Sequence, residues 1–90
     1  MLLDNLTQHG DLKVTMYTFE QAGDELPKHV HDRQTVHITI VARGRVKVFS
    51  HDWEIEAVAG QLLDFKEGDP HGFIALEDGS RIFNIVKHLS

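Results

Sequence analysis

The sequence predicts an all-β fold, a sandwich or barrel of about eight short strands. Apolar and polar residues alternate in several short runs, most clearly at residues 12–16 and 53–57, as in strands with one buried face. Clusters of turn-forming residues, such as those at 21–24 and 67–70, separate these runs. The spacing of apolar residues that is typical of helices is almost absent. Eight strands can enclose an interior just large enough for one small ligand.

The expected strands follow one another with short turns between them. The run at 36–42 is the richest in β-branched residues. At most one turn of helix is expected near the start, at residues 4–8, with Asp4 able to cap it. The strand at 14–19 is expected at a sheet edge, where a second copy could pair with it. In chain order the strands are expected at residues 12–19, 26–31, 36–42, 45–48, 53–57, 62–65, 71–76 and 81–87.

Length and composition narrow the classes of function. Ninety residues are expected to form one domain, residues 1–90. The net charge of −5 and the absence of a basic stripe argue against a nucleic-acid partner. No apolar run approaches the roughly 18 residues of a membrane span, and the first residues lack the basic start of an export signal, so no membrane partner and a cytoplasmic location are expected. Without cysteine, neither a disulfide nor a thiolate ligand is possible.

Four histidines are the most informative feature of the chain. His29 and His31 are two residues apart, so in a strand both belong to one face. His37 follows at an even offset and could share that face, and His71 would be brought to them by the fold. Neutral imidazoles are ligands for transition metals. The pattern therefore predicts a site for one divalent ion, with iron, nickel, zinc, manganese and copper all possible.

The first motif surrounds three of these histidines. Gly23 is followed after five residues by His29, and after one more by His31. Gly44 closes the motif, and seven residues before it stands His37. This segment resembles the first motif of the cupin superfamily, G-x5-H-x-H-x(3,4)-E-x6-G, with His37 where glutamate is usual.

The second motif runs from Gly60 to Ala75 and contains the fourth histidine. It resembles the second cupin motif, G-x5-P-x-G-x2-H-x3-N, with Gly68 and His71 in register. Lys66 stands in place of proline, and Ala75 in place of asparagine. Together the two motifs cover residues 23–75, so the chain is identified as similar to small single-domain cupins of the conserved-barrel type.

The resemblance implies a fold and a metal-binding habit. It implies a double-stranded β-helix, or jelly-roll barrel, a bound metal, and pairing into a homodimer. Because His37 is neutral where the family has a carboxylate, a bound M²⁺ ion would keep its full charge and favour anionic ligands. Gln34 is a rival to His37 as the fourth ligand. Phe73, two residues after His71, is expected on the same face and could line the pocket.

Two classes of function remain open at this point. One is a small metalloenzyme of dioxygenase or isomerase/lyase type, acting on a small anionic metabolite. The other is a non-catalytic module that binds or senses a small ligand. No general base is evident beside the histidines; Tyr17, Asp64 and Lys66 are candidates only if the fold brings them there. The catalytic residues are therefore unassigned, because cupins are chemically diverse.

Overall fold

The computed structural model describes residues 2–29, 34–65 and 70–88, and it confirms the all-β prediction. The described residues form strands and turns, and none of them belongs to a helix that could cross a membrane. Each expected strand is present, with ends within two residues of the prediction wherever those ends lie in the described residues. The strands are β1 (Leu2–His9), β2 (Leu12–Phe19), β3 (Glu25–His29), β4 (Gln34–Arg43), β5 (Arg45–Phe49), β6 (Glu54–Val58), β7 (Leu62–Asp64), β8 (His71–Ala75) and β9 (Ser80–His88).

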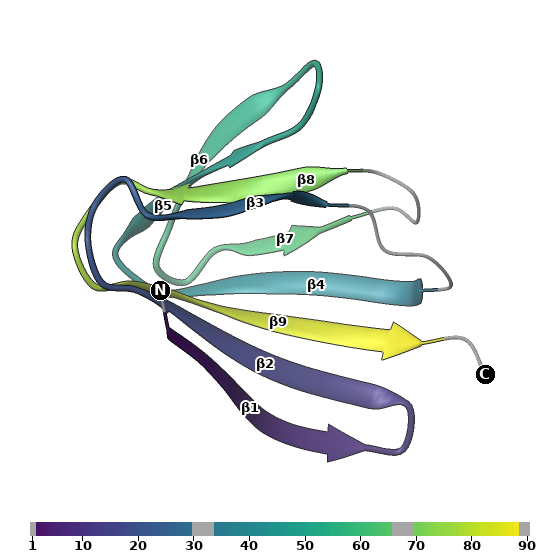
Figure 1. Ribbon diagram of the computed structural model, residues 1–90. Coiled ribbons are helices and arrows are strands. Elements are labelled where there is room, and N and C mark those ends of the chain that lie inside the picture. The colour runs from purple at the N-terminus through teal and green to yellow at the C-terminus, as the bar shows by residue number, and fades with distance from the viewer. Residues whose placement is uncertain (1, 30–33, 66–69, 89–90) are drawn as a thin grey trace.

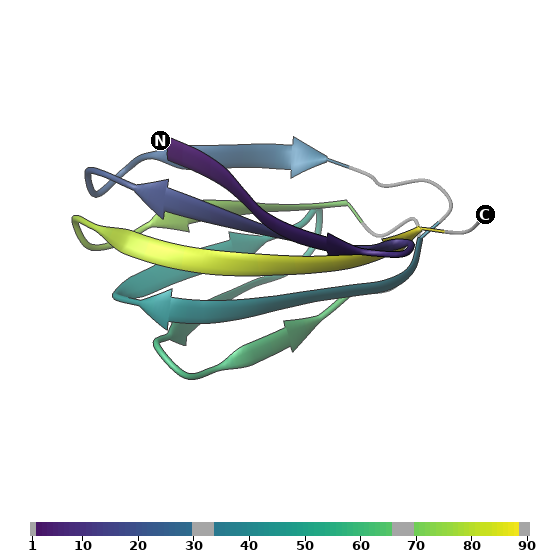
Figure 2. The same ribbon diagram turned by 90° about the horizontal axis from the view of Figure 1, so that it is seen from below.

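The strands form two antiparallel sheets that face each other, as in a jelly roll (Figures 1 and 2). The larger sheet has the strand order β1-β2-β9-β4-β7, and the smaller has β3-β8-β5-β6. Strands distant in the chain therefore lie side by side, such as β4 beside β9 and β3 beside β8. We call the end where β3 and β7 finish and β4 and β8 begin the histidine end of the barrel.

The expectation of a helical turn at residues 4–8 is wrong, because this segment belongs to β1. β1 pairs with β2 from Leu2 opposite Thr18 to His9 opposite Leu12. The connection is only two residues, Gly10 and Asp11, and Gly10 has a φ of 62°. Gly-Asp between two strands is itself a hairpin signal. Pairing along a whole strand outweighs the local preference of one capping residue.

The expectation that residues 14–19 form an edge is also wrong. β2 is hydrogen-bonded to β1 on one side and to β9 on the other, so its backbone groups are already paired. The edge on this side of the sheet is β1, and it exposes Leu2, Leu3 and Leu6 to about half of their full extent, 54%, 53% and 48%.

The core fills the space between the two sheets. Phe19, Val41 and Ile82 come from the larger sheet and are fully buried. Val46 and Val48 oppose them from β5. Burial of side chains of this size stabilises the fold by about 1.5–3 kcal/mol each. The complete buried apolar set is Phe19, Val41, Val46, Val48, Ala57, Phe65, Phe73, Ala75 and Ile82, with Trp53 packed against it.

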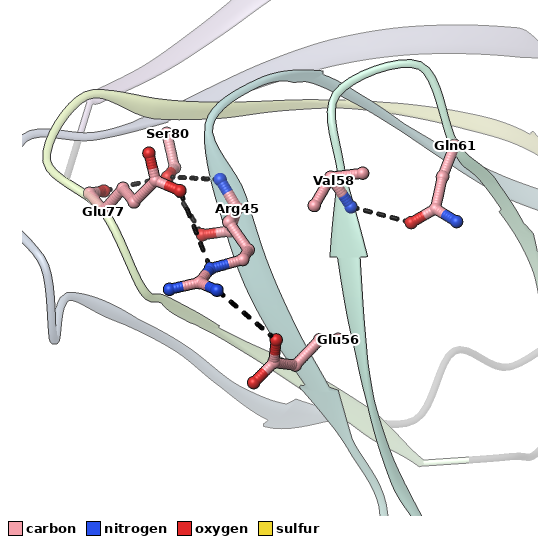
Figure 3. Close-up of polar contacts among 6 residues, drawn as sticks. All are labelled: Arg45, Glu56, Val58, Gln61, Glu77 and Ser80. Carbon is pink, nitrogen blue, oxygen red and sulfur yellow. Dashed lines mark hydrogen bonds and ion pairs between the residues drawn. The ribbon is translucent and has the colours of Figure 1, made fainter.

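The end of the barrel opposite the histidines is closed by polar contacts (Figure 3). Gly44 has a φ of 75°, and a side chain there would collide with Ser80. The Ser80 hydroxyl accepts from the Arg45 N–H at 3.2 Å and lies 2.8 Å from the Glu77 carbonyl. Arg45 also pairs at 3.7 Å with Glu56 and at 3.6 Å with Glu77. These contacts tie the start of β5 to the start of β9.

The adjacent β6–β7 turn is held by a side chain rather than by an ion pair. The side-chain carbonyl of Gln61 accepts from the Val58 N–H at 2.8 Å (Figure 3). The same glutamine donates its own backbone N–H to the Val58 carbonyl at 3.0 Å. The turn therefore sets the position of the short strand β7, which leads toward the histidine end.

Candidate metal centre at the histidine end

His37 and His71 come together inside the barrel from opposite sheets. His37 lies near the start of β4 in the larger sheet, and His71 begins β8 in the smaller sheet (Figure 1). Both side chains are buried, with exposures of 3% and 2%, and their ring centroids are 4.6 Å apart. The fold has thus brought together two histidines that are 34 residues apart in sequence, one from each motif.

Phe65 contacts both histidines. Its ring stacks on the His71 imidazole with a centroid distance of 3.9 Å and an interplanar angle of 10°. It also lies 5.1 Å from the His37 ring, and its backbone N–H donates to the His37 carbonyl at 3.1 Å. Phe65 therefore fixes the His71 ring plane and the local backbone of His37 together, and it covers one face of the pair with hydrocarbon.

Phe73 shares the inner face with His71, as expected from the spacing of two. It is fully buried, and its ring meets the His71 ring edge-on at 5.9 Å and 82°. Phe65 and Phe73 in turn meet edge-on at 6.1 Å. The histidines thus lie against an aromatic wall on one side.

The remaining predicted ligands are only partly covered by the structure. The backbone register of β3 and β8 places His29 directly opposite His71. The side chains of His29 and Gln34 and the whole of His31 lie outside the part that the structure describes. Within the described part, no group of three or more potential ligands of the His, Cys, Asp or Glu type lies close enough to hold a metal ion.

A layer of polar side chains beneath His37 was not anticipated from the sequence. Thr39 and Asn84 are directly opposed across β4 and β9, and the Thr39 hydroxyl donates to the Asn84 carbonyl oxygen at 2.6 Å. Both are buried. The sequence did contain a feature that could have predicted this layer: Thr39 follows His37 by two residues and so shares its face of the strand. Tyr17 also hydrogen-bonds the Asn84 side chain, and burial raises the pKa of its phenol while that bond offsets part of the effect.

The candidate bases named from the sequence do not gather at the histidine pair. Tyr17 pairs with Ile82, which pairs with Val41, four residues or about 13 Å along β4 from His37. Asp64 is exposed and pairs with Ile38, so it belongs to the opposite face of the sheet. Lys66 lies outside the described residues.

A separate hollow lies on the outside of the smaller sheet. It has a volume of about 580 Å³ and is lined by Lys47, Phe49, Ile74 and the turn at 50–54. It contains neither of the buried histidines. Residues 50–52 connect β5 to β6, and His51 among them is exposed. The hollow is therefore separate from the buried histidine pair.

The two facing sheets, with paired histidines inside, define a cupin barrel, and comparison with solved structures agrees. An RmlC-like cupin protein from Desulfovibrio desulfuricans superposes with a TM-score of 0.86 at 25% identity, over 96% of this chain and 80% of that chain. KdgF from a Halomonas species superposes with a TM-score of 0.87 at 20% identity, over 98% of this chain and 80% of that chain. A Thermus thermophilus protein superposes with a TM-score of 0.86 at 18% identity, over 100% of this chain and 85% of that chain.

Comparison at the level of sequence is more specific. The sequence model of the AraC-like ligand binding domain matches residues 12–86, so this chain belongs to that family of ligand-binding cupin domains. No curated protein matches the chain.

Proposed function

We propose that this protein is a ligand-binding cupin domain in which His29, His31, His37 and His71 hold one divalent transition metal, and that the site takes a small anionic ligand. The observation that carries the proposal is the buried pair of His37 and His71, contributed by opposite sheets with ring centroids 4.6 Å apart. Two imidazoles that meet side by side inside a barrel are a donor set suited to one shared transition-metal ion.

The geometry of this pair fits a shared metal. Two imidazoles that bind one ion at about 2.1 Å per nitrogen have ring centroids roughly 4.5–5.2 Å apart for angles between a right angle and a tetrahedral one. The observed 4.6 Å falls within this range. The register of His29 with His71 supports His29 as a third ligand, since directly opposed residues of antiparallel strands belong to one face. His31 is proposed from its motif position, and Gln34 stays the alternative to His37.

The donor set determines which ligand the site would favour. A bound divalent ion would supply a Lewis-acidic position for an anionic oxygen. Four neutral nitrogens leave the charge of the ion uncompensated, so a carboxylate or enolate is favoured over a neutral donor. The rings of Phe65 and Phe73 exclude water from one side of the histidines. Electrostatic attraction is stronger in such a low-dielectric setting than in water.

Of the two functional classes left open by the sequence, we favour ligand binding over catalysis. The family is described by ligand binding, and the aromatic rings packed on the histidines offer no acid or base. The native metal is one of iron, nickel, zinc, manganese and copper, all of which accept imidazole ligands.

The test is a metal titration of protein purified without an affinity tag. We expect one equivalent of Zn²⁺ or Ni²⁺ to bind. His37→Ala or His71→Ala should weaken metal binding by at least roughly tenfold, because even replacing a residue that only orients a metal ligand lowers metal affinity by this much. His29→Ala and His31→Ala should do the same. His9→Ala, at an exposed position of β1, is the matched control. Full affinity in His71→Ala with an intact thermal transition would refute the metal site.

We also propose that the protein forms a homodimer through the edge of β1. β1 is a long edge strand of eight residues, and it exposes Leu2, Leu3 and Leu6. An exposed apolar edge presents unpaired backbone groups and invites pairing with another strand. In a symmetric dimer the same edge of a second copy fills this role.

A further inference from the structure

A row of side chains crosses the inner face of the larger sheet at the histidine end. In β4, His37 pairs with Val86 of β9, and Val86 pairs with Lys13 of β2. Directly opposed residues of antiparallel strands share a face. Lys13 therefore belongs to the same inward face as His37, with one strand between them.

Farther along β2, the same face is buried inside the barrel. Thr15 and Phe19, two and six residues after Lys13, are buried, whereas Lys13 itself is exposed. Lys13 is thus at an inward position where β2 reaches the end of the barrel and is no longer covered. Lys13 therefore lies on the inner face and is also accessible to solvent. A residue that contacts an incoming ligand needs both properties.

The spacing places the ammonium group within reach of a ligand held at the histidines. Two strand separations of about 4.8 Å put the Cα atoms of Lys13 and His37 roughly 10 Å apart. An extended lysine stem carries its charge about 6 Å from the Cα atom. Val86, between them, is short and apolar and competes for neither group.

We propose that Lys13 is the anion-recognising residue of the histidine site, and that the ligand is a small diacid with one carboxylate at the histidine-bound metal and the other on the Lys13 ammonium. This inference rests on the proposed metal site and adds its specificity. Because both side chains extend from the same face of the sheet, the ion and the ammonium would lie up to roughly 10 Å apart, a span that a diacid with two or three carbons between its carboxylates can bridge. A monoacid would use the metal position alone.

Lys87 provides a matched control. It lies at the same end of the barrel, on β9, beside the row but one residue after Val86. Adjacent strand residues point to opposite faces, so Lys87 belongs to the outer face, and it is exposed. Replacing Lys87 changes the net charge as much as replacing Lys13 does, without touching the inner face.

The experiment is calorimetric titration of the zinc-loaded protein with acetate, succinate and glutarate, after stoichiometric zinc has been verified in each variant. In the wild type, we expect a diacid to bind roughly three- to tenfold more tightly than acetate, as for one partly exposed ion pair. Lys13→Gln should remove this preference and leave acetate binding unchanged, and Lys87→Gln should keep it. Raised salt should shrink the preference, because the pair is accessible to solvent.

The possible failures are distinguishable. Stoichiometric zinc without any preference for a diacid overturns the role of Lys13 and leaves the metal site standing. If Lys13→Gln and Lys87→Gln reduced the preference for a diacid equally, the role of Lys13 would also be overturned, since the effect would then be one of net charge. Absence of zinc binding in the wild type overturns the proposed function, and this inference with it.

Discussion

At the scale of single residues, the histidine pair depends on the side chain that packs against it. Phe65 stacks on the His71 imidazole, and its backbone N–H donates to the His37 carbonyl. A ring in this position limits the orientations of the imidazole before any ligand arrives. Such pre-organisation lowers the entropy that binding must overcome.

We therefore expect Phe65→Leu to weaken zinc binding by roughly two- to tenfold, which corresponds to the usual contribution of one aromatic pair. The variant should also lose about 1–2 kcal/mol of unfolding free energy, because a smaller side chain leaves space in the core. Phe73→Leu is the control, since it removes a buried ring that meets His71 edge-on. It should destabilise the fold at least as much with a smaller effect on zinc. Equal effects of the two changes on zinc affinity would contradict the role of stacking.

The single tyrosine of the chain offers a pH-dependent prediction. Burial raises the pKa of Tyr17, so the unfolded chain ionises first, near its ordinary value of about 10. The folded state keeps its proton longer, and the free energy of unfolding must fall as the pH rises through that range. Because the sequence contains one tyrosine, the absorbance of tyrosinate reports on this residue alone.

Titration should show a higher midpoint in the folded protein than in urea. Tyr17→Phe should lose the part of the alkaline destabilisation that comes from the phenol. A folded midpoint at or below that of the unfolded chain would show that the hydrogen bond with Asn84 outweighs burial.

At the scale of elements, the closed end of the barrel depends on one glycine. Gly44 joins β4 to β5 with a positive φ and lies against Ser80. Gly44→Ala adds both a backbone strain and a collision, and we expect it to cost about 1–3 kcal/mol of stability. Gly10→Ala, with a positive φ but open space around it, should cost only the smaller strain. The comparison is made by urea denaturation, and equal losses would mean that contact with Ser80 has no effect.

β1 is the element on which the assembly prediction depends. Leu3→Lys should convert the homodimer to a monomer at micromolar concentration, because a charge would have to be buried where apolar surface was. Leu62→Lys, on the exposed β7 at the other edge of the same sheet, should leave the dimer intact. Light scattering distinguishes the two outcomes, and a monomeric wild type would refute the dimer.

At the scale of the whole molecule, the metal would link the two sheets, since His37 and His71 belong to different ones. Histidine must be neutral to bind a metal, so protons compete with the ion. With four ligands of ordinary pKa about 6.5, we expect release to be steep in pH and complete by roughly pH 4–5. More than one proton should be taken up per ion.

Loss of the ion should lower the thermal stability of the barrel at the same time, because ligand binding to the native state stabilises it. Zinc titrations at pH 7.5 and pH 4.5 that gave equal affinities would contradict the histidine ligands.

The sequence by itself determined the fold class and the alternation of faces. Strand runs and turn clusters predicted eight of the nine strands that the described residues form, and the two glycine-framed motifs predicted that His37 and His71 would meet. These features are local, because a period of two and a turn residue act within a few positions. For the same reason, the sequence predicts that Thr39 shares a face with His37, and Phe73 with His71, because each pair is two residues apart in a strand.

Only the tertiary structure decided which strands became neighbours, and with them the surroundings of the histidines. The first strand was missed because its stability comes from pairing with β2, whereas the prediction relied on a local cap at Asp4. The row from Lys13 to His37 joins β2, β9 and β4, which are distant in the chain. Phe65 and His71 are only six residues apart, but one follows β7 of the larger sheet and the other begins β8 of the smaller sheet. Contacts of this kind depend on strand order and register, which the whole set of packed side chains fixes together and no short segment encodes.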